Sequence, residues 1–192
     1  MHLEKPENDM ERNLNNRRFP ALIIGLLVFS FLDCGSSKSF VIQHEPSLEQ
    51  VTAESDEICI GTRLYFFSGR PCIKLKGEKD NNSGTTQYYL RYEIGSFDVE
   101  LALGTSLKIG ETWFNLKKSS TDYSNSIVVS SLLEPEVLNA IAGGKSFTIS
   151  YTNRAKTENY TLSSSQGLSL RDSLIRLQRL LESEQKMVIQ KK

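Results

Sequence analysis

Two stretches of alternating apolar and polar residues restrict the fold of this chain most strongly. The alternation covers residues 87–94 and 97–103, with the pair Gly95-Ser96 between them. A period of two places the apolar side chains on one face of a β-strand, and a Gly-X pair is favoured in two-residue type II′ hairpins. The sequence therefore predicts an antiparallel hairpin with these facing pairs: Ile94 and Phe97, Tyr92 and Val99, Leu90 and Leu101, Tyr88 and Leu103.

Other segments rich in β-branched and aromatic residues predict further strands. They lie near residues 58–60, 64–67, 72–76, 112–117, 126–132, 145–151 and 160–162. Two helices are expected late in the chain. The first begins at Pro135, since proline suits the first helical position, and ends at Gly143-Gly144. The second is capped by Ser169 with Asp172, and its apolar stripe contains Leu170, Leu174, Leu177 and Leu181.

These elements together predict the fold class. We expect a mainly β protein, α+β at the margin, built as an antiparallel β-sandwich or open barrel with a short helix and a C-terminal amphipathic helix. A single β-rich domain is expected over residues 58–184, and residues 185–192 form a polar tail.

The N-terminal part of the chain has the pattern of a targeting segment. Arg17 and Arg18 precede an apolar run from Phe19 to Leu32. This run is shorter than the ~20 residues that a membrane-spanning helix needs. A basic flank followed by a short apolar segment predicts a signal peptide over residues 1–33. Acidic residues before Arg17 are unusual in such a segment, and Met10 is an alternative start that would remove most of them.

The apolar run ends in Leu32-Asp33-Cys34-Gly35, which resembles the lipobox of bacterial lipoproteins. The resemblance implies that Cys34 is acylated, with palmitate among the acyl groups, and becomes the mature N-terminus. The protein would then be attached to a membrane of the bacterial cell envelope, inner or outer, with the leaflet left open. Asp33 departs from the pattern, because this position is normally small and neutral. An ordinary cleaved signal peptide or an uncleaved anchor is the alternative.

Residues 34–57 are rich in Ser, Glu and Gln, and contain Pro46. Such a composition buries too little apolar surface to become ordered. We therefore expect a lipid-anchored flexible linker in this range.

Two cysteines, Cys59 and Cys72, follow Cys34. An even number in an oxidising compartment predicts a disulfide, and two buried free thiols are the alternative. No histidine lies near them, so they form a poor zinc site.

Charge and histidine content exclude several classes of function. The chain has 23 Lys and Arg against 23 Asp and Glu, without the excess of positive charge typical of a nucleic-acid-binding protein. The two histidines are His2 in the leader and His44 in the linker. A histidine-based catalytic or metal site within the domain is therefore excluded. We expect no cofactor and no enzymatic activity, but a binding or structural module with an unknown protein or glycan partner.

One pair of carboxylates suggests an alternative function. The hairpin register places Glu93 opposite Asp98, and like charges that face each other suggest a weak calcium site or an acid/base pair. Two solvated carboxylates at a hairpin tip are the simpler interpretation. A carboxylate-based hydrolase of envelope polymer, using Glu93, Asp98 or Glu100, is the alternative function.

Exposed aromatic and basic residues suggest a further alternative. Tyr89 and Trp113 fall on predicted outer faces, where they would form a platform for a glycan or peptide. This arrangement is typical of a surface adhesin that binds a host or matrix ligand. Three arginines on the last helix would contact anionic lipid or a partner, or form an ordinary solvated surface: Arg171, Arg176 and Arg179.

The C-terminal part of the sequence resembles a known family. The quoted segments are residues 133–138 (Leu-Glu-Pro-Glu-Val-Leu), residues 142–151 (Ala-Gly-Gly-Lys-Ser-Phe-Thr-Ile-Ser-Tyr) and Leu168-Ser169-Leu170. Their order is similar to the helix, Gly-Lys turn, hairpin and closing helix of small secreted bacterial β-proteins of the invasion-associated locus B type. The closing Leu-x-Gly-Phe of that family is replaced here by Gly167-Leu168-Ser169-Leu170. The resemblance implies an envelope or secreted β-domain and assigns no catalytic residues.

Overall fold

The computed structural model describes residues 40–45, 49–60, 70–95 and 100–190, and for 184–190 the backbone alone. The chain divides into two units, Met1–Ser37 and Lys38–Lys192, and the described residues belong to the second. The described strands are β1 (Val41–Glu45), β2 (Gln50–Glu54), β3 (Ile58–Cys59), β4 (Cys72–Asp80), β5 (Thr86–Gly95), β6 (Ala102–Ile109), β7 (Thr112–Asn115), β8 (Lys117–Asp122), β9 (Ser126–Leu132), β10 (Phe147–Asn153) and β11 (Thr157–Thr161). The described helices are α2 (Pro135–Gly143) and α3 (Ser164–Gln190).

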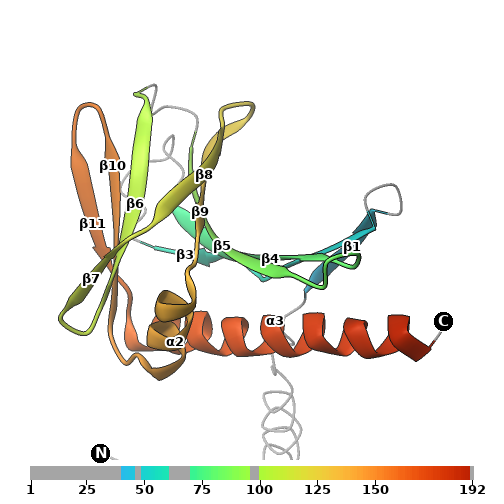
Figure 1. Cartoon of the computed structure of the whole chain (residues 1–192). Coiled ribbons are helices and arrows are strands. Elements are labelled where there is room, and N and C mark those ends of the chain that lie inside the picture. The colour runs from blue at the N-terminus through green and yellow to red at the C-terminus, as the bar shows by residue number, and fades with distance from the viewer. Residues whose placement is uncertain (1–39, 46–48, 61–69, 96–99, 191–192) are drawn as a thin grey trace, which may run out of the picture. The chain divides into compact units, whose positions relative to one another are not determined.

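The described strands form two antiparallel sheets (Figure 1). The first sheet has the order β1-β2-β4-β5-β9-β8, and the short β3 also pairs with β4. The second sheet has the order β11-β10-β6-β7. No closed barrel forms from these strands, and the predicted mainly β class with two late helices is confirmed.

One face of the first sheet is covered partly by the second sheet and partly by α3. Tyr92 of β5 stacks on Tyr151 of β10, with ring centroids 4.9 Å apart. Farther along the same face, Lys79 donates a hydrogen bond of 2.8 Å to the carbonyl of Leu181 in α3. The predicted leucine stripe of α3 is confirmed, because Leu170, Leu174, Leu177 and Leu181 are all buried. Burial of each such side chain stabilises the fold by about 1.5–3 kcal/mol.

The predicted first helix is also confirmed, with a physical reason for its end. Pro135 is its first residue and Gly143 its last. A Cβ added to Gly144 would lie 2.7 Å from Ile109 Cγ2 and 2.8 Å from Phe147 Cζ. Glycine therefore follows α2 because the core leaves no room for a side chain there.

The predicted hairpin between residues 87–94 and 97–103 is wrong. β5 pairs with β4 and β9, whereas β6 pairs with β10 and β7 in the other sheet. Leu101 and Leu103, expected to face Leu90 and Tyr88, are 43% and 51% exposed. Phe97 and Val99 lie outside the described residues. Alternation identifies a strand but not its neighbour, and β4 and β9 occupy both edges of β5.

The predicted linker is corrected over residues 41–45 and 49–57. β1 and β2 form an antiparallel pair there, and β2 continues the sheet beside β4. Val51 and Ala53 are buried, whereas their neighbours on β2 are polar. Two buried side chains contribute little to an overall polar composition, which explains why composition predicted an unstructured segment.

The last helix begins earlier than predicted, at Ser164. Its N-terminal cap is Ser163, whose hydroxyl accepts a 3.3 Å hydrogen bond from the backbone N–H of Gln166. The Gln166 side chain accepts a 2.9 Å hydrogen bond from the backbone N–H of Ser163, which completes a capping box. Ser169 lies within the helix, and the helical backbone reaches Gln190 instead of ending before the predicted polar tail. None of the described helices is both long and apolar enough to cross a membrane.

Candidate functional site

The disulfide between Cys59 and Cys72 joins β3 to β4, as predicted. The two cysteines are register partners in the antiparallel pair. Beside them, Ile60 donates a backbone hydrogen bond of 2.8 Å to Pro71. Glu57, Cys59 and Cys72 form the group of potential metal ligands found within the described residues. Both sulfur atoms belong to the disulfide, so neither is a thiolate ligand in this state.

The outward face of the first sheet carries charged side chains that neutralise one another. We call this surface the charged face, and its charged residues on β2, β4 and β5 are Glu54, Lys74, Lys76, Glu78, Asp80, Arg91 and Glu93.

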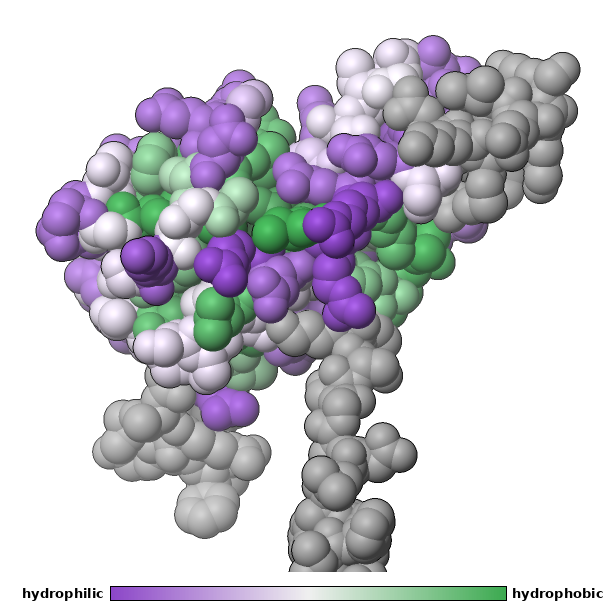
Figure 2. Space-filling view, turned by 90° about the horizontal axis from the view of Figure 1, so that it is seen from below, coloured by the Kyte–Doolittle hydropathy of each residue, from purple (hydrophilic) through white to green (hydrophobic). Residues whose placement is uncertain are grey.

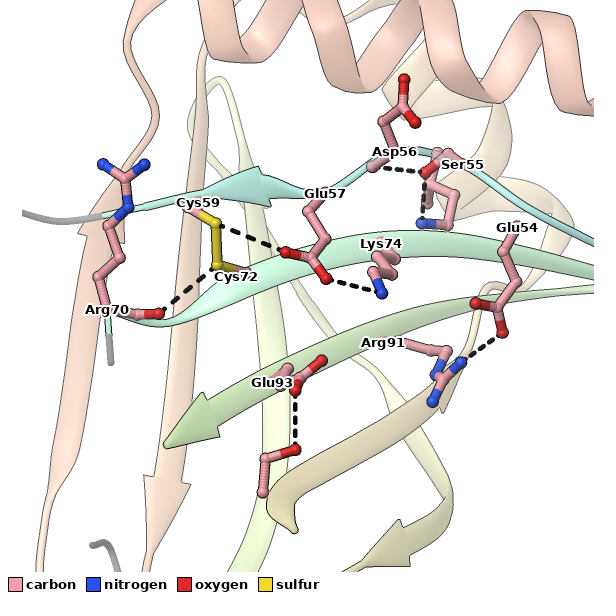
Figure 3. A network of polar contacts seen from close by, with 12 residues as sticks. Glu54, Ser55, Asp56, Glu57, Cys59, Arg70, Cys72, Lys74, Arg91 and Glu93 are labelled. Carbon is pink, nitrogen blue, oxygen red and sulfur yellow. Dashed lines mark hydrogen bonds and ion pairs between the residues drawn. A yellow bond between two sulfur atoms is a disulfide. The ribbon is translucent and has the colours of Figure 1, made fainter. Parts of the chain in front are cut away.

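Three ion pairs involve this face. Arg91 pairs with Glu54, Lys74 Nζ lies 2.7 Å from Glu57, and Lys76 Nζ lies 2.6 Å from Glu78 (Figure 3 shows the first two). Partly exposed pairs of this kind each contribute ~0–1 kcal/mol. They fix the side chains in place and leave the surface close to neutral.

The predicted carboxylate pair rested on the hairpin register, which is wrong. Glu93 lies opposite Cys72 on one side and Val128 on the other, and it accepts a 2.7 Å hydrogen bond from the Ser126 hydroxyl (Figure 3). Asp98 lies outside the described residues, so the pair itself stays a prediction. Glu100 precedes β6 and is exposed.

A buried group of tyrosines lies between the two sheets and was not predicted. Tyr160 donates a hydrogen bond of 2.6 Å to Glu158, and Lys156 Nζ lies 2.7 Å from the same carboxylate. Burial acts to raise the pKa of Glu158, but the hydrogen bonds from Lys156 and Tyr160 outweigh it and lower the pKa. Burial raises the pKa of Tyr92 well above its usual value. These groups therefore keep fixed protonation states at neutral pH, which suits a structural role better than proton transfer.

The outward face of the second sheet is of a different kind. Four strands place short polar side chains in register, and one row across them contains Asn159, Ser150, Ser106 and Asn115. The neighbouring row includes Lys108 and Trp113. We call the outward residues of β6, β7, β10 and β11 the hydroxyl face.

The predicted aromatic platform of Tyr89 and Trp113 does not assemble. Tyr89 is on the first sheet, where it is 9% exposed and donates a 2.6 Å hydrogen bond to Gln87. Burial, and then Glu78, raise the pKa of its hydroxyl. Trp113 is on β7 of the second sheet and is 47% exposed. Only Trp113 therefore matches the predicted exposed position.

The three arginines of α3 lie on a mixed polar surface. Arg176 and Arg179 are exposed, and so are Asp172 and Glu182. Arg171 Nε lies 3.8 Å from Asp172. Figure 2, which views the molecule from below Figure 1, shows hydrophilic side chains across the middle of this surface. Acids among the arginines favour an ordinary solvated surface over a site for anionic lipid.

Comparisons with known proteins give little further information. No protein-family model matches the sequence. No curated protein matches it. Among solved structures, the chain is similar to invasion associated protein B from Bartonella henselae, with 14% identity and a TM-score of 0.41. That similarity covers 74% of this chain and 95% of the other. The C-terminal sequence pattern resembles proteins of the same kind. The structural similarity is too weak to support any argument about function. Cys34 lies outside the described residues.

Proposed function

We propose that this chain is a bacterial cell-envelope lipoprotein, anchored through an acylated Cys34, whose β-domain is a non-enzymatic binding or structural module. The disulfide between Cys59 and Cys72 is the observation that carries the proposal. Disulfides persist in oxidising compartments outside the cytoplasm. A leader with a basic flank, a short apolar run and a lipobox-like end supports the same location.

The surroundings of the carboxylates support binding over hydrolysis. Glu54 and Glu57 are in ion pairs with Arg91 and Lys74, and Glu93 accepts a hydrogen bond from Ser126. The carboxylates of Glu54, Glu57 and Glu93 are therefore occupied by partners within the domain itself. The general acid of a glycoside hydrolase must instead be placed to protonate the leaving oxygen of its substrate.

The test of the anchor is the intact mass of the protein purified from its native membrane. A mature N-terminus at Cys34 that carries the mass of acyl chains is the expected result. A Cys34→Ala variant should lose this mass and leave the membrane fraction. A Ser36→Ala variant, which alters a nearby residue without removing the thiol, should keep both. An unacylated product cut at another position, or an intact leader, would refute the anchor.

A further inference from the structure

The hydroxyl face differs from the charged face in its lack of charge. Among the strand residues that point outward from the second sheet, Lys108 is the single charged one, and its ammonium group lies 2.9 Å from Glu111. The charged face carries seven charged residues on three strands. Both surfaces belong to one small domain, so general solubility does not explain why one of them is neutral.

Cross-strand hydrogen bonds hold the small side chains of the hydroxyl face in place. The hydroxyls of Thr148 and Thr161 are 3.0 Å apart, and those of Thr152 and Thr157 are also 3.0 Å apart. On the other half of the sheet, Ser106 donates a hydrogen bond of 2.9 Å to Asn115. A hydroxyl or amide keeps further donor or acceptor capacity after one such bond. Apart from Ser150, which is buried, the face therefore presents an ordered array of neutral hydrogen-bonding groups.

Trp113 adds a large apolar ring at one side of this array. It is the single tryptophan of the chain and is 47% exposed. It pairs in register with Lys108, so it lies on the outward side, whereas its neighbour Phe114 packs against the core. Tryptophan is enriched at binding surfaces because its side chain offers a rigid apolar plane with one N–H donor.

We infer that the hydroxyl face binds a neutral oligosaccharide, with a sugar ring stacked on Trp113. A sugar has an apolar ring face and a rim of uncharged hydroxyls, which match the indole ring and the Ser, Thr and Asn side chains. Four strands about 4.8 Å apart span roughly 14 Å, which suits several sugar units better than one. The inference rests on the proposed function, since it names the ligand class of the proposed binding module.

The unique tryptophan provides a direct readout. The full chain, in a detergent without a sugar headgroup, is titrated with chitohexaose and cellohexaose while tryptophan fluorescence is recorded. At least one titration should give a saturable change in fluorescence. Because the ligand and the face are both neutral, the affinity should stay nearly constant between low and high salt. No change with either sugar would overturn the inference, and so would an affinity that falls strongly as the salt concentration rises.

Variants locate the site by calorimetry, which needs no tryptophan. Trp113→Ala should weaken binding roughly tenfold or more, as truncation of a central tryptophan does at many interfaces. Trp113→Tyr should restore most of the affinity, because it keeps an aromatic plane. Asn115→Asp places a negative charge in the array at nearly constant size and should also weaken binding. Leu168→Ala, at a residue of α3 that is 50% exposed, is the control and should bind normally.

The same titration with Cys34→Ala separates this inference from the proposed anchor. Sugar binding that survives loss of acylation supports the site alone. Acylated protein that binds neither sugar overturns the site and leaves the lipoprotein proposal intact. Equal binding by Trp113→Ala and the unmodified chain would also refute the site, because the contact would then lie elsewhere.

Discussion

Tyr92 is buried between the sheets, and its environment links stability to alkaline pH. Burial raises its pKa in the folded state, whereas a tyrosine in the unfolded chain titrates near ~10. The raised pKa contributes stability that is fully present below pH ~10. Above that value the unfolded chain loses the proton first, and stability falls by about 1.4 kcal/mol per pH unit for this one group.

Urea unfolding at pH 8 and at pH 11 tests this linkage. The unmodified chain should lose more stability over this step than Tyr92→Phe, which has no phenolic proton. The stability of the variant should also fall, but by less, because burial also raises the pKa values of Tyr88 and Tyr89. An equal fall in both proteins would show that Tyr92 does not titrate on unfolding.

Individual residues were predictable where the local pattern determines their environment. The buried leucines of α3 and the outward position of Trp113 follow from periodicity alone. The partner of Arg91 does not, because Glu54 reaches it from a strand that is 37 residues away in the sequence. The Asn, Ser and Thr rows of the hydroxyl face were missed for the same reason. Each residue is ordinary by itself, and only the pairing of β6, β7, β10 and β11 brings them together.

At the scale of elements, the beginning of α3 gives a test of one corrected prediction. Ser163→Ala should destabilise the domain by about 1 kcal/mol, since it removes the hydroxyl that caps the Gln166 N–H. Ser169→Ala should be neutral or slightly stabilising, because this residue lies within the helix, where alanine is preferred. Chemical unfolding of both variants measures the difference. If Ser169→Ala instead lost more stability than Ser163→Ala, the helix would be capped at Ser169, as predicted from the sequence.

Elements were easier to identify from the sequence than their neighbours. β5, β9, β10 and α2 were all expected close to where they occur. The hairpin prediction failed because a period of two indicates which face of a strand is apolar, but not which sheet the strand joins. The early helix start was missed because the leucine stripe begins at Leu170, about two turns after the cap at Ser163.

At the scale of the whole molecule, the disulfide fastens the short β3 to β4, which lies inside the first sheet. β3 is two residues long, and the disulfide joins it to β4 across a separation of 13 residues. Loss of this bond should destabilise the domain by about 3 kcal/mol in the chain-entropy treatment. Unfolding with and without a reductant measures the effect. The paired variant Cys59→Ser with Cys72→Ser is the control, and its stability should not respond to the reductant.

The first sheet also starts earlier than the sequence indicated, and this changes how far the domain can move. With a lipid on Cys34, the chain between the anchor and β1 would be residues 35–40 instead of the whole predicted linker. Fully extended, six residues reach at most ~20 Å. A domain on so short a connection samples a shallow layer next to the bilayer. Its ligand would then have to come within that layer, on whichever membrane holds the anchor.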